Sequence, residues 1–157
     1  MKQINMKNLK KLLILVFCLS LFGICANAFA GRSKDVSGYY ILSTMPPDSY
    51  VGWTNTTSGT CPGITFPSTI TPGLIPDPAN EIVINPQSVA APYNCTTIYT
   101  SSDTVGPMAG ECLVTVSLRV INGAITKVNL GAIHLGGAQG CRTYPNSSVI
   151  FLGSDLP

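Results

Sequence analysis

Charged and catalytic side chains are scarce in this sequence. Only 10% of its 157 residues are charged, and it has a single histidine, His134. Acid–base and nucleophilic catalysis depend on pairs of such groups held side by side, often with a shifted pKa. The composition therefore favours a binding or structural role over an enzymatic one.

Motifs that carry familiar chemistry are also missing. The sequence has no G-x-S-x-G turn of a serine hydrolase and no D-x-D-x-D-G calcium loop. The glycine-rich stretch 131–140 is not followed by the Lys and Ser or Thr of a phosphate-binding loop. We therefore expect no catalytic motif, no metal and no cofactor.

The first thirty residues have the layout of a secretory signal peptide. Lysines are followed by an apolar run at 12–26, and small residues at alternate positions offer cleavage after Ala28 or Ala30. A membrane-spanning helix needs about 20 apolar residues, so this run is short for an anchor. An uncleaved anchor is the alternative. The signal resembles a bacterial one and predicts export to the periplasm or the extracellular space, with no membrane span in the mature chain.

Removal of residues 1–30 reverses the charge balance. Four of the nine basic residues lie in the signal, which leaves five basic and seven acidic residues and a net charge of −2. The remaining positive charges are scattered, whereas nucleic-acid binding needs a basic patch or stripe. We therefore expect no nucleic acid as a partner, and a protein or a glycan instead.

The cysteines predict disulfide bonds. Two of the six lie in the signal, and the other four are Cys61, Cys95, Cys112 and Cys141. An even number in an exported chain indicates two disulfides, and four cysteines allow three pairings. We favour the nearest-neighbour pairing, Cys61–Cys95 and Cys112–Cys141. Zinc sites use cysteines about two to four residues apart, and the cysteines here are much farther apart.

Prolines and short apolar segments indicate an all-β fold. Nine of the twelve prolines fall between residues 46 and 92, and proline breaks helix interiors. Strand-like segments are separated by turn residues; they are 38–43, 50–54, 81–85, 96–100 and 148–152. We predict that 31–157 is one small sandwich or barrel-like domain of short antiparallel strands, with a Pro-rich meandering loop near 62–92.

The clearest element is a hairpin over 111–133, which turns at Asn122-Gly123. A flush two-residue turn would pair Val116 with Asn129 and place polar groups on the apolar face. Two arrangements avoid this. The favoured one is a three-residue loop, and the other is a two-residue turn with a bulge near Thr126. Both predict a bulge in the hairpin.

Aromatic residues give the best binding hypothesis. Tyr39, Tyr40, Tyr50 and Trp53 gather in the first mature strands, where rings can stack on sugars or anchor a partner protein. Core packing is the alternative for these rings. His134 follows the hairpin and is either a rim residue, a core histidine or a catalytic base.

The resulting hypothesis is an exported, non-enzymatic domain that binds a partner or belongs to a periplasmic or surface assembly. One alternative is a carbohydrate-binding module that uses Tyr50 and Trp53. The other is a small secreted hydrolase that uses His134. The sequence leaves the ligand and the oligomeric state open.

Overall fold

The computed structural model describes residues 36–45, 51–57, 61–103 and 105–153. Their regular elements are ten strands and two three-residue 3-10 helices, η1 (Pro78–Asn80) and η2 (Pro86–Ser88), with no α-helix in these ranges. Within them, no helix has the length and hydropathy to cross a membrane. The signal peptide expected for 1–30 lies outside the described residues.

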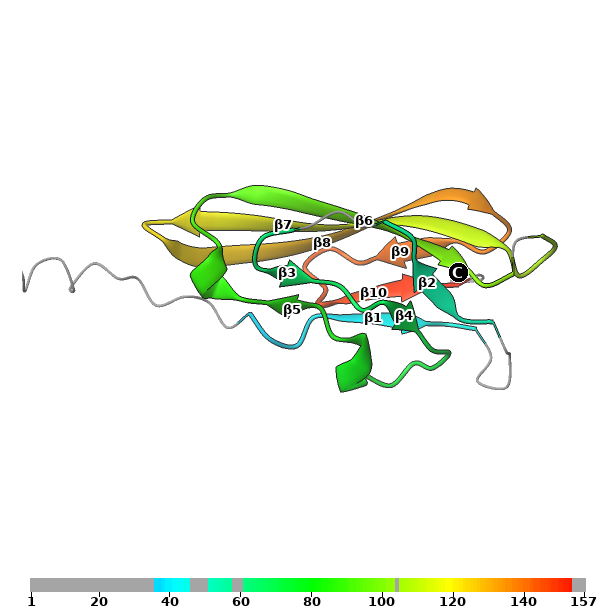
Figure 1. Ribbon diagram of the computed structural model, residues 1–157. Helices are drawn as coiled ribbons and strands as arrows, with labels where there is room; N and C mark the ends of the chain where they lie inside the picture. Colours follow the sequence, from blue (N-terminus) through cyan, green and yellow to red (C-terminus); the bar gives the residue numbers. More distant parts are fainter. Residues whose placement is uncertain (1–35, 46–50, 58–60, 104, 154–157) are drawn as a thin grey trace, which may run out of the picture. The chain divides into compact units, whose positions relative to one another are not determined.

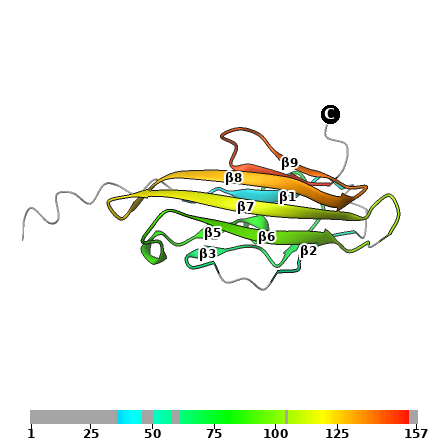
Figure 2. The same cartoon turned by 90° about the horizontal axis from the view of Figure 1, so that it is seen from above.

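The larger sheet has five strands, and each neighbouring pair is antiparallel (Figure 1). In spatial order these are β4 (Thr69–Ile70), β2 (Trp53–Asn55), β6 (Tyr93–Ser101), β7 (Gly110–Ile121) and β8 (Ala124–Gly137). Figure 2 shows β6, β7 and β8 running side by side for most of their length. β7 and β8 form the hairpin expected over 111–133, and β6 is longer than the segment 96–100 expected from the sequence.

Two smaller sheets complete the fold. One has the order β1 (Tyr40–Ser43), β10 (Val149–Leu152) and β9 (Cys141–Thr143), and the other pairs β3 (Ile64–Thr65) with β5 (Val83–Ile84). β9 and β10 are antiparallel, but β1 and β10 are parallel. The mostly antiparallel all-β prediction is therefore confirmed, with β1–β10 as an exception that local sequence patterns do not specify.

A single core joins the three sheets. In β7 every second residue is buried, namely Cys112, Val114, Val116, Leu118 and Val120. They pack in one cluster with residues of the smaller sheets, among them Ile41, Ile64, Ile84, Ile150 and Leu152. Successive strand residues point to opposite faces, so the period-two pattern of this hairpin buries one face.

The β7–β8 hairpin contains the predicted bulge. Ile121 pairs with Ala124 across a two-residue turn, and a register shift at Arg119/Val120 leaves Thr126 as the extra residue. The favoured three-residue loop is therefore wrong, and the bulge near Thr126 is found. Asn122 and Gly123 have φ angles of 52° and 75°, and a tight two-residue turn requires positive φ at both positions.

Both disulfides have the predicted pairing. Cys112–Cys141 links β7 of the five-stranded sheet to β9 of the three-stranded sheet. Cys61–Cys95 links β6 to the segment just before β3. The first bond thus joins two sheets, and the second fixes the segment that leads into β3 against the five-stranded sheet.

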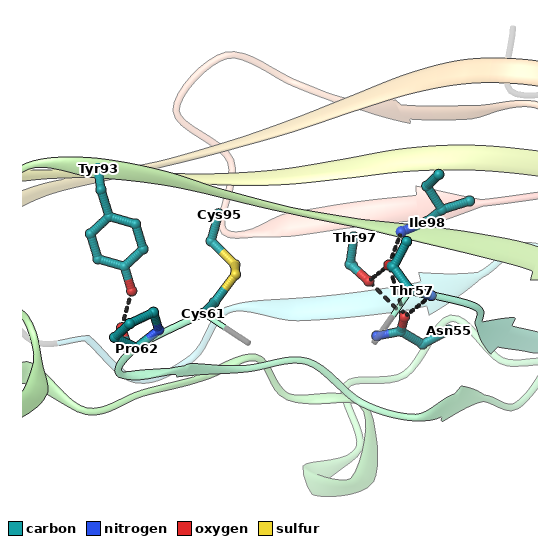
Figure 3. Close-up of a disulfide and its surroundings, with 8 residues drawn as sticks. All are labelled: Asn55, Thr57, Cys61, Pro62, Tyr93, Cys95, Thr97 and Ile98. Atoms are coloured by element: carbon teal, nitrogen blue, oxygen red, sulfur yellow. Dashed lines mark hydrogen bonds between the residues drawn. A yellow bond between two sulfur atoms is a disulfide. The ribbon is translucent and has the colours of Figure 1, made fainter. Parts of the chain in front are cut away.

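β6 holds the proline-rich segment through side chains on one face (Figure 3). The Tyr93 hydroxyl donates to the Pro62 carbonyl, and the Tyr99 hydroxyl donates to the Pro67 carbonyl at 2.6 Å. Burial raises the pKa of Tyr99 far above its ordinary value, so this hydroxyl keeps its proton and remains a donor. Together with Cys95, these tyrosines fix the path of the chain after Cys61.

A polar cluster ties the end of β2 to β6 (Figure 3). The Asn55 Oδ1 atom accepts from Thr97 Oγ1 at 2.6 Å and from the Thr57 backbone N–H at 3.1 Å. The Thr57 hydroxyl in turn accepts from the Ile98 backbone N–H at 2.8 Å. The chain therefore leaves β2 along a fixed path.

Candidate functional site

A pocket of about 510 Å³ lies at the end of β1. Two segments far apart in the sequence form it, residues 44–45 directly after β1 and residues 71–80, which run from the end of β4 through η1. The lining residues are Thr44, Met45, Thr71, Pro72, Gly73, Leu74, Ile75, Asp77 and Asn80. Pockets of a few hundred Å³ with mixed apolar and polar walls are the usual form of ligand sites.

The pocket exists because the chain is attached to β1 at two points and leaves it in between. The Gly73 N–H donates to the Ser43 carbonyl at 3.1 Å, and the Ile82 N–H donates to the Tyr39 carbonyl at 2.7 Å. Between these bonds, residues 74–80 arch away from the edge of β1 and contact both β1 and β4 through η1 (Figure 1). The space under this arch is the pocket.

Local chemistry makes the arch stiff. Pro76 and Pro78 fix their own φ angles, which lowers the entropy lost when a ligand binds. Asp77 caps η1 by accepting the Ala79 N–H at 2.8 Å, as expected for an Asp before a Pro-initiated turn. The prolines and the cap therefore restrict the backbone of the arch.

The rim of the pocket carries two exposed aliphatic side chains. Leu74 is 61% exposed and Ile75 is 82% exposed, whereas Met45 in the same lining is only 3% exposed. Adjacent large apolar side chains held in water beside a hollow are typical of interaction sites. The pocket thus offers an apolar surface that folding leaves uncovered.

The polar part of the pocket has an unmet hydrogen bond. The Asn80 side chain is 3% exposed, and its Oδ1 atom is buried with no partner among the described residues. A buried acceptor without a donor costs about 1–3 kcal/mol, and exceptions of this kind often mark functional sites. Among the described residues of the pocket lining, Asp77 is the one that carries a charge.

Trp53, one of the aromatic residues predicted to bind ligand, does not line this pocket. Trp53 is fully buried in β2, opposite Ile70 and Ser101, and forms part of the core. A buried ring has no free face for a sugar, so core packing is the alternative that the structure supports for Trp53. Tyr50, which the sequence predicts to bind ligand together with Trp53, lies outside the described residues.

His134 lies on β8 with an exposed side chain, and its Nε2 atom is 2.8 Å from the Gly136 carbonyl oxygen. A catalytic base needs a nucleophile and an orienting acid beside it, but this contact is with a backbone oxygen. His134 does not line the pocket. The structure therefore does not bring Trp53 and His134 together: Trp53 is buried in β2 and His134 is exposed on β8.

Two carboxylates share a different pocket. Asp103 and Glu111 both line a smaller pocket of about 190 Å³, beside glycines of β7 and β8. In the described part of the chain, no group of three His, Cys, Asp or Glu side chains is placed to hold a metal ion. Two carboxylates on the rim of a shallow hollow are weaker evidence for a site than the larger pocket.

Sequence reasoning missed the residues that form the larger pocket. Leu74-Ile75 stands between Gly73 and Pro76, in a stretch too short and too rich in turn residues for a buried strand. The place of this pair between turn residues is the sequence signal that both side chains are exposed. The contribution of Met45 has no such signal, because it comes from a distant segment.

These features define a mostly β protein with antiparallel sheets, two disulfides and an exposed, partly apolar pocket. The chain matches no protein-family model, no curated protein and no solved structure. Its function is therefore argued from the pocket.

Proposed function

We propose that this chain is an exported, non-enzymatic binding domain whose pocket takes apolar side chains from a short segment of a partner protein. The observation that carries the proposal is the pair Leu74 and Ile75, held in water at the rim of a 510 Å³ pocket. Covering one such side chain stabilises a complex by about 1.5–3 kcal/mol.

A protein segment suits this lining better than a glycan does. Sugars bind through stacking on aromatic rings, and the described residues of the pocket wall include aliphatic side chains and no aromatic ring. The proline-stiffened arch also lowers the ordering cost, which otherwise offsets much of the gain from apolar contact. The aliphatic walls therefore support a protein partner.

The proposal also includes a two-layer sandwich architecture and export from the cytoplasm. A two-layer sandwich is supported by the core shared between the five-stranded and three-stranded sheets, and by the disulfide that joins them. Export is supported by two disulfides, which persist in oxidising compartments.

Export has a direct test. Mass spectrometry of the protein from the periplasm or medium of a bacterial host is expected to find a chain that begins at Phe29 or Gly31. A folded, disulfide-bonded chain that keeps residues 1–30 would contradict cleavage of this segment.

The pocket is tested with peptides of about twelve residues selected from a phage-displayed library on the wild-type protein. The double substitution Leu74→Ser/Ile75→Ser is expected to raise the Kd of a selected peptide at least tenfold in titration calorimetry, since about 1.4 kcal/mol corresponds to that factor. The matched control is Val83→Ser/Val105→Ser, which removes two other exposed aliphatic side chains and should change Kd less than twofold.

Three outcomes separate the alternatives. Failure to enrich any peptide, or equal loss in the pocket variant and the control, contradicts the proposal. Binding of an oligosaccharide panel that survives Leu74→Ser/Ile75→Ser favours a glycan ligand at another surface. A third variant, Asn80→Leu, removes the buried Oδ1 atom that has no partner among the described residues, and it should raise the free energy of unfolding by about 1 kcal/mol.

A further inference from the structure

β8 is an open edge of the five-stranded sheet. Among the described residues it pairs with β7 along one side and with no strand along the other (Figure 2). It is 14 residues long, and its pairing with β7 runs without a register shift from Lys127 to His134. The edge of a strand presents a row of backbone N–H and C=O groups, and the chemical complement of that row is another extended strand.

This edge has little protection against pairing. Edge strands of natural proteins carry charged side chains, proline or bulges that keep other strands away. The stretch from Val128 to Leu135 has no proline and no Lys, Arg, Asp or Glu, and the register shifts lie at its two ends. In the same stretch Ile133 is 58% exposed and Leu135 is 47% exposed. The middle of β8 therefore combines an open backbone with exposed aliphatic side chains.

The outer face of the β7–β8 hairpin is positive at one end and negative at the other. Arg119 and Lys127 are exposed and lie directly opposite each other near the turn, and like charges in this arrangement repel. Glu111 lies at the other end, opposite Gly136, and lines the 190 Å³ hollow together with Asp103. Among the described residues, no ion pair involves any of these four charged side chains.

Antiparallel pairing of β8 with β8 of a second copy fits these features together. A two-fold axis perpendicular to the sheet and near Ala132 keeps the same face of both copies outward. The two strands then run in opposite directions, so Lys127 of one copy lies beside Gly136 of the other. A Cβ at Gly136 would meet nothing within 4 Å, so the Lys127 side chain has space to cross it towards Glu111 of the second copy.

We propose that two copies of this chain pair through β8 and join their five-stranded sheets into one continuous sheet. Ile133 of each copy covers Gly131 of the other, and Lys127 of each copy donates to Glu111 of the other. The occupant of the edge is a second copy because the hairpin itself supplies both charges of the pair. This interface goes beyond the proposed function, and none of its residues lines the pocket at the end of β1.

Sedimentation velocity tests the dimer. The mature protein should show a monomer–dimer equilibrium between about 5 and 300 µM, since one pair of strands is small beside a standard protein interface. Ile133→Lys places a charge on the edge and should raise the Kd of the dimer at least about tenfold. The matched control is Val83→Lys, which places the same charge at a similarly exposed residue of β5 and should change the Kd less than about twofold.

A charge exchange tests the register. Lys127→Glu and Glu111→Lys should each raise the dimer Kd about tenfold, because the two-fold axis repeats the ion pair and each reversal turns attraction into repulsion. The double variant Lys127→Glu/Glu111→Lys restores opposite charges and should return the Kd to within about threefold of wild type.

Three results would overturn the proposal. They are a monomer at every concentration, equal effects of Ile133→Lys and Val83→Lys, and a double variant that dimerises as weakly as the single variants. Peptides selected on the wild-type protein should bind Ile133→Lys with unchanged Kd. Failure of the dimer would therefore leave the proposed pocket function standing, and failure to enrich any peptide would leave the dimer standing.

Discussion

Replacement of Trp53 by alanine is expected to lower the free energy of unfolding by about 3–5 kcal/mol, the cost of removing a large aromatic side chain from a packed core. Trp53 is 0% exposed, and it packs in the cluster that joins the three sheets. Urea unfolding followed by circular dichroism is the measurement, because Trp53 is the sole tryptophan and its fluorescence disappears with the substitution.

Two control substitutions separate the effect of the lost side-chain volume from the effect of changing a residue in β2. Thr54→Ala changes the next residue of β2, which is exposed, and should cost less than about 0.5 kcal/mol. Trp53→Phe should cost less than alanine, because it keeps a ring and removes an indole N–H that has no partner among the described residues. A loss below about 1 kcal/mol for Trp53→Ala would show that this side chain is not in a close-packed core.

A substitution at Gly110 in β7 tests the packing of Trp53 from the other side of the contact. A Cβ at Gly110 would lie 2.6 Å from Trp53 Cη2 and 2.6 Å from the Gln139 carbonyl oxygen, so Gly110→Ala should destabilise by about 1–3 kcal/mol. Gly136→Ala is the matched control, since a Cβ there meets nothing within 4 Å. Equal stability of the two variants would contradict the packing of Trp53 against β7.

Removal of the Cys112–Cys141 disulfide is expected to cost about 3–4 kcal/mol, from the chain entropy that a loop of this length restores to the unfolded state. Cys112→Ala/Cys141→Ala leaves the β7–β8 hairpin paired but frees the three-stranded sheet from it. Native-state hydrogen exchange should therefore accelerate more in β9 and β10 than in β7.

Removal of the Cys61–Cys95 disulfide provides the comparison with Cys112–Cys141. Cys61→Ala/Cys95→Ala opens a loop of similar length and should cost a similar free energy. Residues 71–80 lie inside that loop, so its loss should also weaken peptide binding at the pocket. Unchanged peptide binding in Cys61→Ala/Cys95→Ala would contradict a role of that disulfide in holding the pocket. Uniform hydrogen exchange in Cys112→Ala/Cys141→Ala would contradict a role of the other disulfide in holding β9 and β10.

Much of the fold follows from local sequence patterns. Period-two alternation in β7, together with Asn122-Gly123, predicts the hairpin, and the need to bury one face predicts its bulge. Cysteine spacing predicts the two disulfides, because nearest-neighbour pairing gives the shortest loops. These inferences succeed because each depends on residues close together in the chain.

The remainder depends on contacts between distant segments. The choice between a three-residue loop and a bulge at Thr126 is an exception, because it is local, but the burial pattern cannot make it since both arrangements bury the same valines. The burial of Trp53 depends on its neighbours in β4 and β6. The pocket needs Met45 beside the 71–80 arch, and no local pattern in either segment indicates that they meet.

The parallel pairing of β1 with β10 imposes an order on folding. The Thr44 N–H donates to the Leu152 carbonyl at 2.7 Å across a sequence separation of 108 residues. Synthesis from the N-terminus delivers residues 40–43 long before 149–152, so the three-stranded sheet is completed late. Pairing across so long a separation is also slow. During that interval the edge of β1 that later pairs with β10 remains open to proteases and to the wrong strand of a neighbouring molecule.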